Sequence, residues 1–309
     1  MKNKYRKNLI YTPLAVLALA TVTANAGEVK TMTPAVETPS EDVISGILKL
    51  DFNTHFISYG ADVWSDGSSM SDPTFNPNLE LYFALPGDLT LTIGTWWDVN
   101  SKPGSGNSPI GGRIQEVDVY AGLGYTFDKF TVSATYQAWM YGSETEEILD
   151  IKFAYDTFLA PSLTIHNRLD QGAAPGDEGT ILVLGLSHTI EAGPLAISFP
   201  VNLAYFVTDG FHQDPKAAIA ATPDIPAELG IPAVPASPAV AAIEEADAGF
   251  GYLSIGVAAS LPLSPYIGDG FGEWALNGGV TYFITEDEII PNNPQSSFLT
   301  ASLGLSVAF

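Results

Sequence analysis

Cysteine is absent from this chain of 309 residues. Its absence excludes disulfide bonds and every metal site that depends on thiolate ligands. The sequence therefore predicts a fold that is held together by packing and by main-chain hydrogen bonds.

Basic residues are also scarce, with 12 Lys and Arg against 35 Asp and Glu, which gives a formal net charge of −23. A nucleic acid is an improbable partner, because phosphates are bound by Lys and Arg that displace counterions. The mean hydropathy is nevertheless slightly positive, at +0.16. A chain with one lipid-facing side and one wet side explains both numbers.

Long apolar runs are missing beyond the first residues. The start is basic at Lys2, Lys4, Arg6 and Lys7, is apolar over 14–19, and reaches the small residues Ala24-Asn25-Ala26. This layout is typical of a secretory signal peptide, and its apolar run is too short to span a bilayer as a helix. We expect residues 1–26 to be a signal peptide that is cleaved after Ala26.

A period of two dominates the sequence after a Thr-, Glu- and Pro-rich lead-in at 27–46, which we expect to be a flexible periplasmic segment. Apolar and polar residues alternate, as in Leu48, Leu50 and Phe52 against Lys49 and Asp51, and this pattern indicates strands. Twelve such segments occur, at 47–57, 78–85, 89–98, 115–127, 130–141, 147–157, 162–170, 180–190, 195–207, 250–261, 273–284 and 297–309.

The connections between these segments alternate in length, as in bacterial barrels with short periplasmic turns and longer outer loops. The inner turns are 86–88, 128–129, 158–161, 191–194 and a longer one at 262–272. The outer loops are 58–77, 99–114, 142–146, 171–179, 208–249 and 285–296, of which 142–146 is short. The sequence thus predicts an all-β, antiparallel, up-and-down transmembrane barrel of about 12 strands over 47–309, located in the cell outer membrane.

The loop at 208–249 is the longest connection, and its middle is rich in Ala and Pro. The prolines exclude a long helix or strand there. Two arrangements stay open from sequence: a mobile external flap, or a loop that folds into the pore.

The last segment alternates Leu303, Leu305 and Val307 with small residues and closes on Phe309. This pattern is typical of the signal that the outer-membrane assembly machinery recognises. We therefore expect Phe309 to act as an assembly signal.

A stretch within the fourth segment, Glu116-Val117-Asp118-Val119-Tyr120-Ala121-Gly122, resembles the TorF-like family of putative outer-membrane porins. The following turn at 128–129 and the aromatic-rich stretch 132–141 continue the resemblance. Residues 53–60 sit where the family has its first strand and a Ser-x-Tyr-x-x-Arg-Gly stretch, although this chain has no Arg there. The resemblance covers about residues 47–170 and implies a porin-like barrel without indicating a particular solute.

The alternation also assigns charged residues to the inner face of the barrel, where fixed charge concentrates the opposite ion. The expected pore-lining residues are Lys49, Asp51, Glu80, Glu116, Asp118, Asp150, Lys152, Asp156, Arg168 and Asp170. Seven of the ten are acidic, so we expect a narrow passive channel with a cation preference.

Other functions stay open at this point. The charges could instead pair and fill the interior of a non-conducting structural or adhesion barrel. An outer-membrane lipid hydrolase is a weaker alternative, because His188 falls on the lipid-facing series but no Gly-x-Ser-x-Gly motif accompanies it. We predict no enzymatic activity, no cofactor and no metal. The expected partners are outer-membrane lipid, lipopolysaccharide, the assembly machinery and small solutes or cations.

The acidic groups at 144–147 and 286–288 fall in the expected outer loops. Such residues could share divalent cations with lipopolysaccharide phosphates, but a solvated loop is the simpler interpretation.

Overall fold

The computed structural model describes residues 44–64, 73–101, 113–142, 144–213, 241–268, 272–291 and 293–309. The expected signal peptide, nearly all of the lead-in segment and the Ala- and Pro-rich middle of the longest loop lie outside these residues. The lead-in ends earlier than expected, because the first strand begins at Ile44 and not at residue 47.

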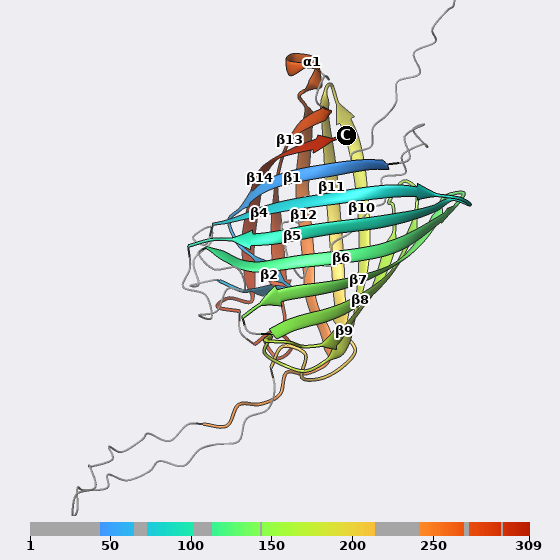
Figure 1. Ribbon diagram of the computed structural model, residues 1–309. Coiled ribbons are helices and arrows are strands. Elements are labelled where there is room, and N and C mark those ends of the chain that lie inside the picture. Colours follow the sequence, from blue (N-terminus) through green and yellow to red (C-terminus); the bar gives the residue numbers. More distant parts are fainter. Residues whose placement is uncertain are drawn as a thin grey trace, which may run out of the picture.

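Twelve antiparallel strands form one closed barrel, as the alternation predicts. Figure 1 shows the wall of this barrel from the side. Each strand pairs with its neighbours in the sequence, and β1 closes the ring by pairing with both β4 and β14. The strands are β1 (Ile44–Asn53), β4 (Thr74–Leu85), β5 (Leu89–Val99), β6 (Ile114–Phe127), β7 (Phe130–Tyr141), β8 (Glu144–Tyr155), β9 (Ser162–Asp170), β10 (Gly179–Ala192), β11 (Leu195–Phe206), β12 (Gly249–Pro262), β13 (Glu273–Thr285) and β14 (Ser297–Ala308).

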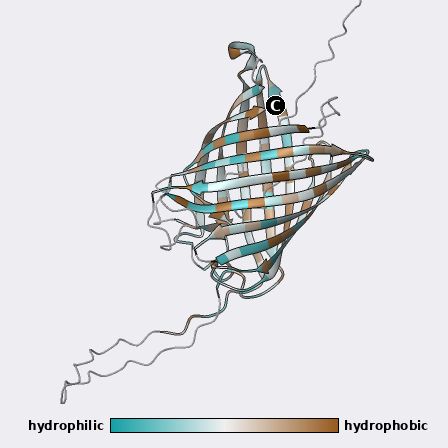
Figure 2. Ribbon diagram, in the orientation of Figure 1, coloured by the Kyte–Doolittle hydropathy of each residue, from teal (hydrophilic) through white to brown (hydrophobic). Residues whose placement is uncertain are grey.

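The two faces of the wall differ in chemistry, and Figure 2 shows brown and teal alternating along the strands. On β14, Leu299, Leu303 and Leu305 are exposed on the outer face, whereas Phe298 and Thr300 are buried inside. A closed sheet leaves no unpaired strand edge, and an apolar outer face suits lipid. The described residues include no helix long and apolar enough to cross a membrane.

The connections give the barrel a loop end and a turn end. The loop end carries the connections 54–73, 100–113, 142–143, 171–178, 207–248 and 286–296; the turn end carries 86–88, 128–129, 156–161, 193–194 and 263–272. The last of these contains the short helix α1 (Ser264–Ile267). By the rule for bacterial barrels, the loop end faces outward.

The first predicted strand was wrong at its far end. The wall strand β1 stops at Asn53, and the chain then enters the barrel interior as a small hairpin of β2 (Ile57–Ser58) and β3 (Ala61–Asp62). Phe56 was expected on the outer face but is 2% exposed and packs against Trp96 of the inner wall, with ring centroids 5.5 Å apart. Alternation continues through 54–57, so the sequence pattern could not reveal that the chain leaves the sheet.

Strands β4 and β8 begin earlier than predicted. Pro77, one residue before the predicted start, lies within β4 opposite Leu50 of β1. An in-strand Pro lacks only its own N–H donor, so a strand tolerates it where that donor is not required. On β8, Glu144 to Glu146 extend the strand that was expected to begin at residue 147.

Candidate pore and its outer mouth

Eight of the ten residues expected to line the pore lie on wall strands, at positions whose side chains alternate with the outer-facing ones. These are Lys49, Asp51, Glu80, Glu116, Asp118, Asp150, Lys152 and Arg168. Asp170 shares their parity, but it is the exposed last residue of β9 and accepts a hydrogen bond from the N–H of Gly172. Asp156 lies beyond the end of β8, exposed in the turn, because β8 finishes at Tyr155.

Three interior groups that the sequence-based list lacks complete the charged wall: Asp98, Glu146 and His166. Asp98 accepts hydrogen bonds from the side chains of Trp64, Thr74, Asn76 and Asn100. Glu146 was expected in a solvated outer loop, but it is 2% exposed inside the barrel. Strand parity could have placed Asp98 and His166 inside, whereas Glu146 required the correct start of β8.

A hydrogen bond between β6 and β4 on the inner wall depends on the close approach of a tyrosine ring to a glycine of β5, the strand between them. Tyr120 of β6 lies over Gly94 of β5 and donates a hydrogen bond of 2.9 Å to Glu80 of β4. It also accepts one of 2.9 Å from Asn78. A Cβ at Gly94 would lie 2.3 Å from the Tyr120 ring, so only glycine lets this tyrosine span the middle strand.

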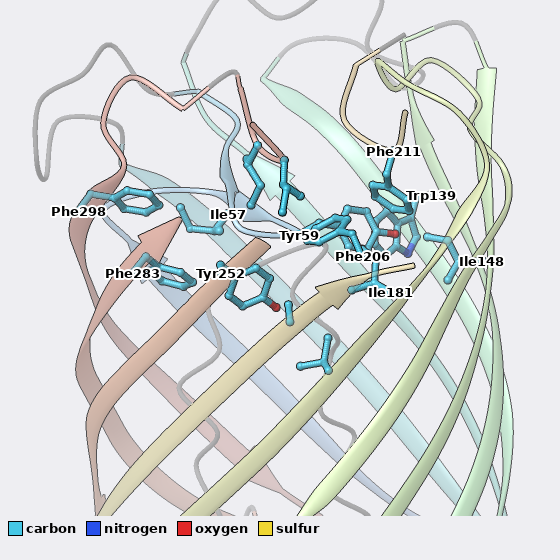
Figure 3. Close-up of a cluster of buried hydrophobic side chains, with 14 residues drawn as sticks. Ile57, Tyr59, Trp139, Ile148, Ile181, Phe206, Phe211, Tyr252, Phe283 and Phe298 are labelled. Carbon is cyan, nitrogen blue, oxygen red and sulfur yellow. The ribbon is translucent and has the colours of Figure 1, made fainter. Parts of the chain in front are cut away.

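The loop-end half of the interior is filled by an apolar cluster, which Figure 3 shows across the barrel mouth. Tyr59, at the tip of the β2–β3 hairpin, lies near the centre of this cluster. Wall residues surround it, and Phe211 enters from the connection that follows β11. The cluster comprises Ile57, Tyr59, Trp139, Ile148, Ile181, Val183, Ala204, Phe206, Phe211, Tyr252, Phe283, Ile289, Ile290 and Phe298.

A buried ionic group lies directly against this cluster. Arg168 Nε donates to Glu146 Oε1 at 2.7 Å, and both side chains are 3% exposed. Tyr59 donates to the same carboxylate at 3.4 Å and contacts His166 Nε2. His166 Nδ1 in turn lies 2.5 Å from Asp150 Oδ1. The hairpin tip therefore joins charged residues of β8 and β9.

Arg168 also holds the longest connection in place. Its Nη1 donates 2.7 Å to the carbonyl of Phe211 and 3.1 Å to that of Asp177. The neighbouring His212 is buried, and its Nε2 lies 3.2 Å from the carbonyl oxygen of Tyr59. Burial and the Arg168 charge lower the pKa of His212 to about 3. The start of the longest loop is thus packed into the barrel mouth at Phe211 and His212, whereas residues 241–245 at its other described end are exposed; its middle lies outside the described residues.

The inward-pointing residues differ in exposure. Lys49, Asp51, Tyr82, Ser187 and Ser306 point inward and are half-buried, whereas Lys152, Ser198 and Ser260, which lie near the turn end on β8, β11 and β12, are buried.

His188 was the candidate for lipid hydrolysis. Its Nδ1 lies 2.9 Å from the carbonyl oxygen of Phe158, and its ring packs on that of Phe158 with centroids 4.0 Å apart. These contacts tie β10 to the β8–β9 turn and involve no serine. A role as an anchor at the turn end accounts for them.

A closed antiparallel barrel with an apolar outside and polar groups on its inner wall defines this chain as a transmembrane β-barrel of the outer-membrane type. No family model matches the sequence, and no curated protein matches it. Solved structures that are similar include a KdgM porin, with 9% identity over 86% of this chain and 99% of that one and a TM-score of 0.42. A NanC porin has 9% identity over 85% and 98%, with a TM-score of 0.41. LpxR from Salmonella typhimurium has 8% identity over 85% and 99%, with a TM-score of 0.40. These similarities are too low to bear on function.

Proposed function

We propose that this barrel is a narrow passive channel that prefers cations. The observation that carries the proposal is the charge of the inner wall, where buried and half-buried positions hold seven acidic and three basic residues. The acidic ones are Asp51, Glu80, Asp98, Glu116, Asp118, Glu146 and Asp150; the basic ones are Lys49, Lys152 and Arg168.

An excess of fixed negative charge inside a narrow, low-dielectric lumen attracts cations and repels anions. Glu116 and Asp118 lie two residues apart on the same face of β6 and are both buried. They add two acidic groups close together on one strand of the inner wall.

The alternative is a non-conducting structural or adhesion barrel, and the apolar cluster at the loop end favours it. Both functions are compatible with an outer-membrane location and with contacts to lipopolysaccharide. The expected contact of Phe309 with the assembly machinery and the resemblance to the TorF-like family also stay predictions.

Recording from planar bilayers that contain the refolded protein tests the channel. A salt gradient should give a reversal potential of cation-selective sign, and the preference should shrink as salt rises, because the Debye length falls from about 10 Å at 0.1 M to about 3 Å at 1 M. The double variant Glu116→Gln, Asp118→Asn should weaken the preference. The matched control Glu286→Gln, Glu288→Gln removes two acids of an outer loop and should change it less.

An anion-selective current would overturn the cation preference. A silent barrel would favour the structural alternative, provided that variants with a loosened mouth are silent as well.

A further inference from the structure

We propose that the segment 54–64 is a movable gate at the outer mouth, and that Arg168 is the residue that latches it shut. This inference rests on the proposed channel, because a gate needs a passage to close. It concerns a different part of the molecule, however, and it can be tested separately.

The gate is built from a short hairpin whose tip is strained. Tyr59 and Gly60 have φ angles of 51° and 82°, so both occupy the left-handed region. Two consecutive positive φ angles are typical of a type I′ hairpin turn, in which Asn and Gly are preferred. A bulky Tyr is disfavoured in this region, and such strain is retained where the surroundings compensate for it.

The surroundings that hold Tyr59 lie across the lumen on the opposite wall. Its ring stacks on Trp139 with centroids 5.4 Å apart, and it meets Phe211 edge-on at 4.9 Å. Its hydroxyl contacts Glu146 and His166. The tip is thus held by side chains of β7, β8 and β9, and not by the strand from which the hairpin emerges.

Two further attachments fix the rest of the segment. The Asn293 side chain donates 2.9 Å to the carbonyl of Gly60 and accepts 2.7 Å from the N–H of Asp62. Trp64 donates 2.8 Å to Asp98. At its base, Thr54 pairs with Ala301 of β14 through two hydrogen bonds of 2.9 Å, which anchor the segment where it leaves the wall.

Arg168 is the latch because it contacts the hairpin and two loops while Glu146 holds it on the wall. Its guanidinium carbon lies 3.7 Å from the ring centroid of Phe211 and 5.3 Å from that of Tyr59. It binds the carbonyls of Phe211 and Asp177, which belong to two different loops, while Glu146 of the wall neutralises its charge. Removing Arg168 leaves Glu146 buried without its cation, and a buried unpaired charge strongly favours hydration. Displacement of the hairpin, whose Tyr59 donates to Glu146, would open a route for that water.

The mobility of the gate can be measured with a single introduced cysteine, because the natural chain contains no cysteine. Ile57 on β2 is 0% exposed, so Ile57→Cys should react slowly with a charged, membrane-impermeant thiol reagent added to proteoliposomes. Adding Arg168→Ala should raise the rate at least about tenfold, because opening is no longer opposed by the latch. Arg113→Ala, which removes an exposed Arg at the loop end, is the matched control and should leave the rate unchanged.

Two measures guard against misfolding. Asp247 lies on an exposed loop, so Asp247→Cys should react rapidly with the reagent in every gate variant. The extent of its reaction measures the amount of folded protein that the reagent can reach. Tyr59→Phe keeps the ring but removes the hydroxyl contacts with Glu146 and His166, so it should give a smaller increase in the same direction if Arg168→Ala does not fold.

Conductance is recorded on the same variants, so that the two proposals can fail separately. Faster reaction together with a higher open probability supports the gate and the channel. Faster reaction without any current supports the movable segment but refutes the channel. An unchanged reaction rate in both Arg168→Ala and Tyr59→Phe, with a measurable current, refutes the gate and leaves the channel standing.

Discussion

Arg168 and Phe211 are bound to each other twice: the guanidinium packs on the ring at 3.7 Å, and Nη1 donates to the main-chain carbonyl at 2.7 Å. A cation over an aromatic face contributes about 2 kcal/mol when it is desolvated. Because Arg168 belongs to β9 and Phe211 to a loop, this pair draws a long external connection into the barrel mouth. The closed mouth therefore depends on a polar residue of the wall as much as on apolar packing.

Gly60→Ala is expected to loosen the mouth. The new Cβ would lie 2.6 Å from Tyr252 Cδ1 and 2.9 Å from Ile290 Cδ1, at a position with φ of 82° that L-residues rarely adopt. Reactivity of Ile57→Cys should rise as it does with Arg168→Ala. Gly87→Ala is the control, because that residue has a similar φ of 79° in a turn with open space around its Cα and lies at the other end of the barrel. An equal rise in both variants would contradict the assignment to the mouth.

Acid is expected to open the mouth through His212. In the closed state the pKa of His212 is about 3, because burial and the nearby Arg168 charge disfavour the imidazolium. Exposure would return the pKa to about 6.5. Between pH 6.5 and pH 3, His212 is therefore protonated in the open state but neutral in the closed state. The closed state is most favoured above pH 6.5, and the ratio of closed to open protein falls by up to about tenfold per pH unit as the pH falls toward 3.

The groups that face His212 are Arg168, the carbonyl of Tyr59 and the rings of Phe206 and Phe211, with Glu146 beyond Arg168. A variant must therefore separate His212 from every other group that acid could affect. The Ile57→Cys rate, divided by that of Asp247→Cys at each pH, should rise on acidification and should rise less in His212→Gln. Identical pH profiles in both proteins would assign the effect to another group.

The barrel could be predicted from sequence because the membrane imposes a simple rule. Every wall strand alternates lipid-facing and inward-facing residues, so the twelve segments followed from period two, and eight of the ten charged residues assigned to the inner face lie at inward positions of wall strands. The same rule failed at 54–57, where His55 and Phe56 continue the alternation while the chain turns into the lumen. A buried apolar residue inside a barrel and a lipid-facing one have the same hydrophobicity.

Only part of the ionic cluster at the mouth could be predicted from the sequence. Asp150 and Arg168 were assigned to the interior, but their partners Glu146, Tyr59 and Phe211 come from a strand end and from two loops. Pairing across a lumen depends on how loops fold inward, and loops lack the periodicity on which the strand assignments rest. The glycine under Tyr120 shows the same limit, since the need for Gly94 appears only when β4, β5 and β6 are placed side by side.

Gly46→Leu is expected to weaken the closing seam. Gly46 of β1 exchanges two main-chain hydrogen bonds with Phe309, of 2.7 and 3.0 Å, and a Cβ at Gly46 would lie 2.8 Å from the Phe309 ring. The free energy of unfolding in lipid vesicles should fall, and Phe309→Ala should restore part of the loss by removing the clash. Gly124→Leu is the control, because the nearest atoms to its Cβ are at 3.8 and 3.9 Å. Additive effects of the two substitutions would rule out the contact.

Phe309→Ala alone tests the expected assembly signal. The outer-membrane level in cells should fall more than the stability of the refolded barrel, because recognition by assembly machinery acts during insertion. Phe127→Ala, another strongly exposed aromatic residue at the turn end, is the matched control and should be inserted at a nearly normal level. Equal insertion of both variants would remove the signal role.

Leu305→Arg and Ser306→Arg together test which face of β14 meets the lipid. Leu305 is an exposed outer residue, whereas Ser306 points inward, is half-buried and accepts a hydrogen bond of 2.9 Å from Asn277. The two are adjacent, so they lie at nearly the same depth in the bilayer.

An Arg on the lipid face costs about 2–4 kcal/mol at the midplane and less toward either surface. Leu303, in the middle of β14 and 58% exposed, should therefore give the largest loss as Leu303→Arg, followed by Leu305→Arg. Ser306→Arg should cost least, because its side chain points into the barrel interior and not into lipid, even though Lys49 lies opposite it on β1. Urea unfolding in lipid vesicles measures all three, and a loss for Ser306→Arg as large as that for Leu305→Arg would contradict the assignment of the two faces.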